Sequence, residues 1–241
     1  QLLVFSPMRI LHVNNYYLPW LGYDAELAWT QHEQGHEVSF AASDRLTVDK
    51  AETARPARDP DDPINSMLLK SIVLGGRIVF LPGIARVLLK VRPEVVHCHS
   101  LFDLTAVALA MLKPVLGYRL IFCSHASDIN TDSRSTWWRR AAHTTYRFMF
   151  GWIVKTAADH VVAVAELERE MAIRELALDP DEVGILRVGA PAARFKPDLS
   201  MRNHKREELG VSEDDIVAIY VGSVVPRKRL KDLVEAFARL A

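Results

Sequence analysis

Short apolar runs alternate with helix-like segments along most of the chain. The apolar runs are rich in Val, Ile and Leu and predict strands over residues 9–14, 37–42, 94–99, 120–124, 160–165 and 182–188. Between them, the pattern predicts helices over residues 24–34, 104–115, 135–158 and 166–176. Strands that alternate with helices of this length are typical of βαβ units, and continuous apolar strands are covered on both faces. The sequence therefore predicts an α/β fold, a Rossmann-like parallel sheet with helices on both faces.

The segment between the second and third of these strands is the least regular part of the pattern. Residues 47–63 are rich in Pro, Asp, Arg and Ala, which indicates a loop. Residues 64–90 are expected to be mostly helical, with breaks at Gly75-Gly76 and at Pro82.

The length of 241 residues corresponds to about 1.6 domains at roughly 150 residues each. We expect one N-terminal Rossmann-like domain over residues 8–196 and a polar connector over residues 197–214. Residues 215–241 are expected to be the first βα unit, a strand and then a helix, of a second, incomplete domain. Met8 opens the first strand, so residues 1–7 are expected to be non-native.

Composition and charge exclude several classes of protein. Thirty basic residues balance thirty acidic ones, which argues against a general nucleic-acid binder. The two cysteines, Cys98 and Cys123, cannot form a disulfide framework and are expected to be reduced, as in a cytoplasmic protein. The longest apolar stretch, residues 71–89, contains arginine and proline and is not a membrane span.

A glycine turn, Gly22 followed by Tyr23, comes between the first strand and the first helix. Ligands of open parallel sheets bind at the carboxyl ends of the strands, and the next helix N-terminus favours an anion there. The turn is thus a candidate acceptor or phosphate loop, although a tight turn also explains the glycine. No G-x-G-x-x-G motif supports a dinucleotide fingerprint.

Histidines end two of the predicted strands. His97 and His99 should share one face while Cys98 points to the other, so the three residues cannot easily bind one metal ion. No H-E-x-x-H or C-x-x-C motif accompanies them, and a zinc site is not expected. We interpret His99 as a cleft residue.

The loop after the strand at residues 120–124 contains His125 and Asp128. An imidazole at this position can donate to a sugar hydroxyl or a phosphate, and a buried, hydrogen-bonded histidine is the alternative. Ser124 is a poor candidate nucleophile because no G-x-S-x-G elbow surrounds it. We take His125 as the catalytic candidate and Asp128 as a cleft residue.

The predicted helix over residues 135–158 lies in a stretch that has basic residues and no acidic one between residues 133 and 158. Arg139, Arg140 and Arg147 are the candidates to face an anionic membrane surface. The alternative is that the helix packs its apolar side on the core and its arginines are merely solvated.

A basic turn precedes the last predicted helix. Gly222 follows a predicted strand over residues 216–221, and Arg227 and Lys228 come before the helix that begins at residue 230. Backbone donors, a helix N-terminus and mobile cations suit a diphosphate, which makes these three residues candidates for donor-phosphate binding. A plain basic turn is the alternative.

Taken together and in this order, these motifs resemble the family 4 glycosyltransferases, which have the GT-B fold. The segment 19–23 is similar to the family's P-x-x-G-G loop, with Tyr23 in place of the second glycine. His97-Cys98-His99 resembles the family's HxH strand, and His125 its strand-end histidine. Four further segments match the family. They are the turn at Gly35 before the second strand, the strand at residues 158–165, the passage between the two domains at residues 195–197, and the first unit of the donor domain at residues 220–228 and 233–237.

The resemblance implies two Rossmann-like domains around a cleft, a nucleotide-sugar donor, and retention at the transferred sugar. The acceptor is expected to be a glycolipid or polysaccharide precursor, with the enzyme cytoplasmic or peripheral on the inner membrane face. No cofactor and no metal ion are expected. Lys228 matches the lysine on the donor diphosphate, Gly22 lies near donor phosphate or acceptor, and His125 lies near the transferred sugar.

The sequence departs from the family pattern at three places. Ser223 replaces an arginine, residues 188–191 replace an N-G-x-D turn, and the E-x7-E carboxylates are expected beyond residue 241. We therefore expect this chain alone to have little transferase activity. Two other hypotheses stay open: a non-catalytic acceptor- or nucleotide-binding module, and a metal-dependent hydrolase that uses His97 and His99.

Overall fold

The computed structural model describes residues 6–15, 23–45, 63–74, 78–128, 136–190, 192, 195–222, 224 and 228–239. The side chains of residues 138, 139, 142 and 143 lie outside this description. The chain divides into two compact units, Gln1–Gly189 and Ala190–Ala241, and each unit is described by itself.

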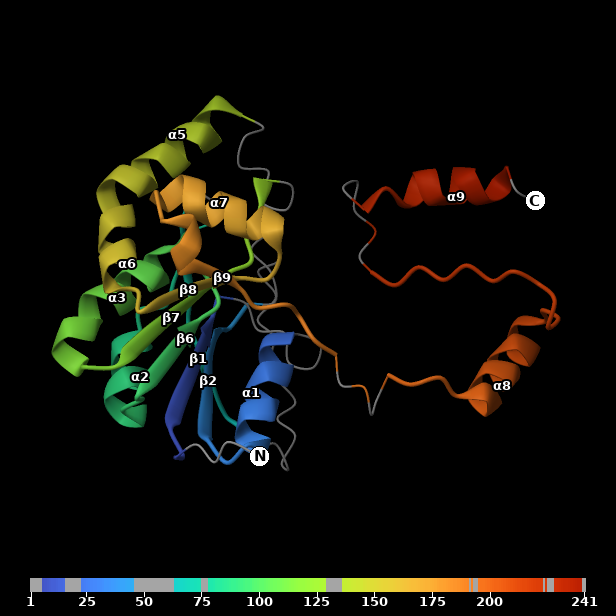
Figure 1. Ribbon diagram of the computed structural model, residues 1–241, viewed down its shortest axis with the longest axis horizontal. Helices are drawn as coiled ribbons and strands as arrows, with labels where there is room; N and C mark the ends of the chain where they lie inside the picture. Colours follow the sequence, from blue (N-terminus) through green and yellow to red (C-terminus); the bar gives the residue numbers. More distant parts are fainter. Residues whose placement is uncertain are drawn as a thin grey trace. The chain divides into compact units, whose positions relative to one another are not determined.

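The first unit is built on a seven-stranded parallel sheet with the order β3-β2-β1-β6-β7-β8-β9 (Figure 1). The α/β fold class is therefore confirmed. The strands are β1 (Arg9–Asn14), β2 (Glu37–Ser43), β3 (Asn65–Leu69), β6 (Val95–Cys98), β7 (Arg119–Ser124), β8 (His160–Ala163) and β9 (Val183–Ile185).

Helices cover both faces of this sheet. Figure 1 shows α1 on the opposite side of the sheet from α2 and α3. The helices are α1 (Tyr23–Glu33), α2 (Ile84–Val91), α3 (Leu104–Leu116), α5 (Trp137–Tyr146), the π-helix η1 (Arg147–Gly151), α6 (Trp152–Ala157), α7 (Glu166–Leu176) and the short 3-10 helix η2 (Pro180–Glu182).

Alternation along the strands divides the side chains between two unequal layers. Leu11, Val96 and Phe122 join residues of α2 and α3 in the larger buried core. Ile10 and Val38 pack with Ala28 of α1 in a smaller one. The even-numbered residues of β1 therefore face α1, and this layer also contains the histidines described below.

The prediction of a mostly helical segment over residues 64–90 is wrong for its first part. Residues 65–69 form β3, and an antiparallel pair, β4 (Ile72–Leu74) and β5 (Ile78–Phe80), precedes α2. Four of the six residues in β4 and β5 are Ile or Val, which favour strands. Pairing with β2 along Ser39–Ser43 places β3 at the edge of the sheet.

The long helix predicted over residues 135–158 is interrupted. A π-helical turn, η1, separates α5 from α6. Gly151 is buried at this turn, and a Cβ atom there would lie 3.1 Å from Cδ2 of Leu176 in α7. The close approach between the helices accounts for a glycine at this position.

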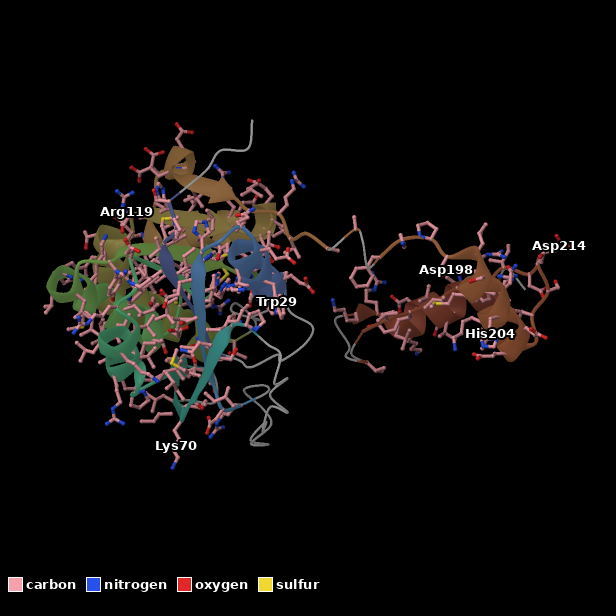
Figure 2. All side chains as sticks on the ribbon, turned by 90° about the horizontal axis from the view of Figure 1, so that it is seen from below. Trp29, Lys70, Arg119, Asp198, His204 and Asp214 are labelled. Atoms are coloured by element: carbon pink, nitrogen blue, oxygen red, sulfur yellow. The ribbon has the colours of Figure 1, made fainter. Side chains whose placement is uncertain are left out.

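The second unit contains α8 (Leu199–Leu209) and α9 (Leu230–Ala238). Asp198, labelled with His204 in Figure 2, caps α8 by accepting a hydrogen bond from the amide of Met201 at 3.0 Å, and Gly210 ends it in a left-handed conformation. The predicted polar connector therefore contains a helix.

The strand predicted over residues 216–221 is also absent: all of these residues except the half-buried Tyr220 are exposed, and no described strand pairs with them. A strand is stable only beside a partner that satisfies its backbone groups. The helix predicted from residue 230 is observed as α9. The assignment of residues 8–196, 197–214 and 215–241 to domains stays a prediction.

Candidate functional site

The sheet order predicts a ligand-binding position beside β1. Because β1 lies between β2 and β6, the strand order reverses there, and open α/β sheets bind ligands outside the carboxyl ends of the strands at this point. Asn14 ends β1, His99 follows β6, and His125 follows β7. Residues predicted from strand ends therefore meet at one edge of the sheet.

Four imidazoles stack across the face that α1 covers. The ring centroids of His97 and His99 are 4.4 Å apart, and each lies 5.2 Å from that of His12. The ring of His125 continues the stack at 5.7 Å from His99. Burial lowers the pKa of His12 to about 4 and the pKa values of His97 and His99 well below their usual range. These three rings are therefore neutral at pH 7.

Hydrogen bonds determine which nitrogen carries the proton in two of these rings. His12 Nε2 lies 2.7 Å from Oε1 of Gln31, an acceptor, so His12 donates at Nε2. In the neutral ring Nδ1 is then an acceptor, and it lies 2.9 Å from His99 Nε2. His99 must donate at Nε2, which leaves a lone pair on its Nδ1.

The lone pair on His99 Nδ1 lies beside a carboxylate oxygen of Asp24. Asp24, the second residue of α1, is buried, and Asn14 Nδ2 donates to its Oδ2. Its Oδ1 lies 3.1 Å from His99 Nδ1. Among the residues that the structure describes, neither Oδ1 nor Nδ1 has a hydrogen-bond partner, although both are buried. Burial also raises the pKa of Asp24, while His125 and His12 oppose this shift.

His125 is the imidazole of this group that reaches solvent. Its side chain is 21% exposed, against 1% for His99. The hydroxyl of Tyr23 contacts His125 Nδ1 and lies 3.0 Å from Nε2, and Asp24 Oδ1 lies 4.0 Å from Nε2. Burial lowers the pKa of His125, and Asp24 partly counteracts this. The arrangement presents an oriented, neutral imidazole that can form a hydrogen bond to a bound molecule.

Of the predicted site residues in the first unit, the structure brings Tyr23, His99 and His125 together. Asp128 instead forms an ion pair with Arg174 of α7, at 2.9 Å. Gly22 lies outside the described residues. The alternation expected for the HxH strand is observed, since Cys98 packs in the larger core while His97 stacks on the α1 side.

The remaining predicted residues lie elsewhere. Gly222, with a φ of 154°, and Lys228, which is exposed, belong to the second unit, and Arg227 lies outside the described residues. Arg140 of α5 and Arg147 of η1 are exposed, and the side chain of Arg139 is outside the description. The proposed roles of all these residues stay predictions.

Asp24, His12 and Gln31 also belong to the site, although the sequence pattern did not predict them. The alternation of side chains along the strands was one available signal. β1 and β6 pair in parallel with His12 beside His97, so both side chains lie on the same face of the sheet. The acidic residue in the first turn of the next helix was a second signal, because that helix must cover this face.

Among the residues that the structure describes, two groups of side chains have metal-binding composition. His12, His97 and His99 form one, and His99, Cys123 and His125 form the other. Within each group, one donor atom from every residue lies within 4.8 Å of the others.

The part of the chain that the structure describes contains no helix long and apolar enough to cross a membrane.

Comparison with protein families gives one match over most of the chain. The sequence model of Glycosyltransferase Family 4 matches residues 23–194. A D-inositol 3-phosphate glycosyltransferase of Streptomyces scabiei (strain 87.22) is 31% identical over 84 residues, which cover 35% of this chain and 19% of that protein.

Solved structures of Anabaena Alr3699/HepE share the fold. The complex with UDP and glucose matches with a TM-score of 0.69 and 15% identity, over 97% of this chain and 58% of that one. The complex with UDP-glucose matches with a TM-score of 0.66 and 14% identity, over 95% of this chain and 57% of that one. The chain thus spans less than three fifths of the length of these structures and about a fifth of the curated relative.

Proposed function

Because this chain belongs to glycosyltransferase family 4, we propose that it is the acceptor-side part of an enzyme that moves a sugar from a nucleotide-sugar to a glycolipid or saccharide precursor. The observation that carries the proposal is the group formed by Tyr23, Asp24, His99 and His125 at the carboxyl edge of the sheet. The fold match to HepE, a protein solved with UDP and with UDP-glucose, favours a nucleotide-sugar donor.

In this proposal His125 donates a hydrogen bond to a hydroxyl of the transferred sugar. Tyr23 and Asp24 act as positioning residues, because the Tyr23 hydroxyl contacts the His125 ring at Nδ1 and Asp24 Oδ1 lies 4.0 Å from its Nε2. A neutral imidazole suits this task since it can donate at one nitrogen and accept at the other. The Gly22 turn lies next to Tyr23 in the sequence and is assigned to acceptor or donor phosphate.

Transfer breaks the bond from the anomeric carbon to the diphosphate and forms a bond to the oxygen of an acceptor hydroxyl, whose proton passes to the leaving diphosphate or to solvent. Negative charge develops on the leaving diphosphate. We assign its stabilisation to Lys228, with Arg227 and the backbone at Gly222, since fixed cations at developing charge are the strongest common catalytic device. The stereochemical course is proposed to be retention, and no metal ion is assigned to this step.

The test is a donor screen on the whole transferase with a panel of nucleotide-sugars and a lipid-linked saccharide acceptor. We expect release of nucleoside diphosphate with one donor, dependent on the acceptor, and little turnover from the 241 residues alone. Binding of a nucleotide-sugar without any release of diphosphate would instead support a non-catalytic binding module.

A surface of the first unit favours peripheral membrane attachment as a companion proposal. Trp137, Phe148 and Trp152, along α5, η1 and α6, are 75%, 76% and 63% exposed. The exposed Arg140 and Arg147 lie on the same helical segment, which carries no acidic residue. Exposed aromatics with basic neighbours are typical of helices that lie on anionic bilayers, where a glycolipid acceptor resides.

Replacing both Phe148 and Trp152 by serine is expected to weaken binding to phosphatidylglycerol vesicles at least about tenfold, because each aromatic ring contributes about 1.5–3 kcal/mol when fully buried. Vesicle sedimentation measures the partition coefficient. Trp29→Ser provides the control, since Trp29 is exposed on α1. Equal binding of the double variant contradicts membrane attachment through these rings, and equal binding to neutral phosphatidylcholine vesicles contradicts a contribution from the basic residues.

A further inference from the structure

Nitrogen, sulfur and carboxylate ligands surround one point at the carboxyl edge of the sheet. His99, Cys123 and His125 each place a donor atom within 4.8 Å of the other two. Asp24 Oδ1 borders the same group, 3.1 Å from His99 Nδ1 and 4.0 Å from His125 Nε2. These residues come from α1, β7 and the segments after β6 and β7.

Positive charge, from a proton or a metal ion, would stabilise the contact between His99 and Asp24 at this point. As derived above, Gln31 and His12 leave a lone pair on His99 Nδ1, and this lone pair lies beside a carboxylate oxygen. Within the described ranges, the two atoms do not form a hydrogen bond with each other or with any other group. Two buried electron pairs at 3.1 Å repel each other unless a proton or a metal cation lies between them.

We propose that His99, Cys123 and His125, with Asp24 as the fourth ligand, form a binding site for a borderline transition-metal ion of the Zn²⁺ type. Imidazole, thiolate and carboxylate are the ligands that Zn²⁺ takes in proteins. Ligand atoms of a tetrahedral zinc site lie about 3.4 Å apart, since each bond is about 2.1 Å. The two Asp24 distances lie on either side of this value.

The other group of three, His12, His97 and His99, is a poorer site. His12 uses both of its nitrogens in hydrogen bonds, to Gln31 and to His99. Metal binding there would break one of these bonds, and the group contains no anionic ligand to offset the charge. The group around Cys123 includes a carboxylate, and the partial exposure of His125 offers a path for the ion.

Binding of the ion is coupled to the cysteine proton. Burial, together with Asp24, raises the pKa of Cys123 to about 12, so the thiol holds its proton at pH 7. A coordinated thiol is deprotonated, and the ion must therefore displace this proton into solvent. The bound ion would also occupy His125, which makes the site inhibitory toward the proposed sugar contact, although metal binding does not depend on that function.

Titration of the purified chain with Co²⁺ tests the proposal, because a Co²⁺–thiolate bond gives a charge-transfer absorption. We expect one equivalent to bind with this absorption and to be displaced by Zn²⁺. Cys123→Ser is expected to abolish the absorption. Cys98→Ser is the matched control: Cys98 lies in the larger core on the opposite face, and a serine hydroxyl can keep its hydrogen bond to the carbonyl of Ser100.

Two further variants keep the test decisive if Cys123→Ser fails to fold, as checked by circular dichroism. His125→Gln and Asp24→Asn each remove a proposed ligand and are expected to weaken binding by more than the about 10- to 100-fold lost when an outer-shell partner of a metal site is removed. Absence of stoichiometric binding in the wild-type chain overturns the proposal. An unchanged absorption in folded Cys123→Ser also overturns it.

Discussion

Replacing His125 by alanine is expected to reduce kcat for sugar transfer by about 10²–10³-fold, the usual loss when one oriented hydrogen-bond donor is removed from a reacting group. The side chain combines the features that this role needs. It follows β7 at the carboxyl edge of the sheet, reaches solvent, and is oriented by Tyr23. Steady-state kinetics of the whole transferase with its donor and acceptor measure the effect.

His160→Ala is the matched control, because His160 is an exposed histidine at the start of β8, and its replacement is expected to leave kcat unchanged. The His125 effect should fall mainly on kcat, since a contact made in the transition state contributes there rather than to KM. A His125→Ala enzyme that keeps wild-type kcat would remove this residue from the proposed chemistry and leave it as a packing residue of the imidazole stack.

The central strands of the sheet could be predicted because strands that are buried on both faces have nearly continuous apolar sequences. β1, β6 and β7 have neighbours on both sides and are covered by helices, so they form nearly continuous apolar runs. β3 pairs only with β2, and its residues are at most half-buried. The pattern of this edge strand carried no such signal, and the segment was wrongly interpreted as helical.

Some residues of the candidate site could also be predicted from the sequence, and others could not. His99 and His125 were predictable because a parallel sheet brings the carboxyl ends of its strands to one edge. Asp24 was not, because its importance arises only when α1 packs across β1 and brings its carboxylate to 3.1 Å from His99. His12 and Gln31 are equally local contacts between a strand and its covering helix. Such contacts depend on helix rotation, which sequence periodicity defines only loosely.

The π-helical turn is a further feature that sequence pattern does not reveal. A continuous helix through residues 147–151 would satisfy the apolar periodicity, but packing against Leu176 of α7 demands the small Gly151 at this turn. The exposed aromatics Phe148 and Trp152 lie in and directly after the turn. The surface proposed to contact membrane is thus partly a product of this local irregularity.

The second large effect is expected at Lys228. Lys228→Ala should lower kcat of the whole transferase by about 10²–10³-fold, because the ammonium group would no longer offset charge that develops on the leaving diphosphate. Lys228 is exposed directly before α9, where the first-turn amides add positive partial charge. The measurement is the rate of nucleoside diphosphate release at saturating donor and acceptor.

Lys231→Ala is the control, since Lys231 lies three residues further on, is 87% exposed, and pairs with Glu235 at 3.5 Å. Lys228→Arg tests whether the positive charge alone is needed or whether the shape of the lysine side chain matters as well. If a cation alone is needed, arginine restores most of the rate, because it also binds phosphate oxygens. Equal rates for Lys228→Ala and Lys231→Ala would show that the lysine does not act on the diphosphate. The charge would then have to come from Arg227 or Arg229, the two cations that flank it in the sequence.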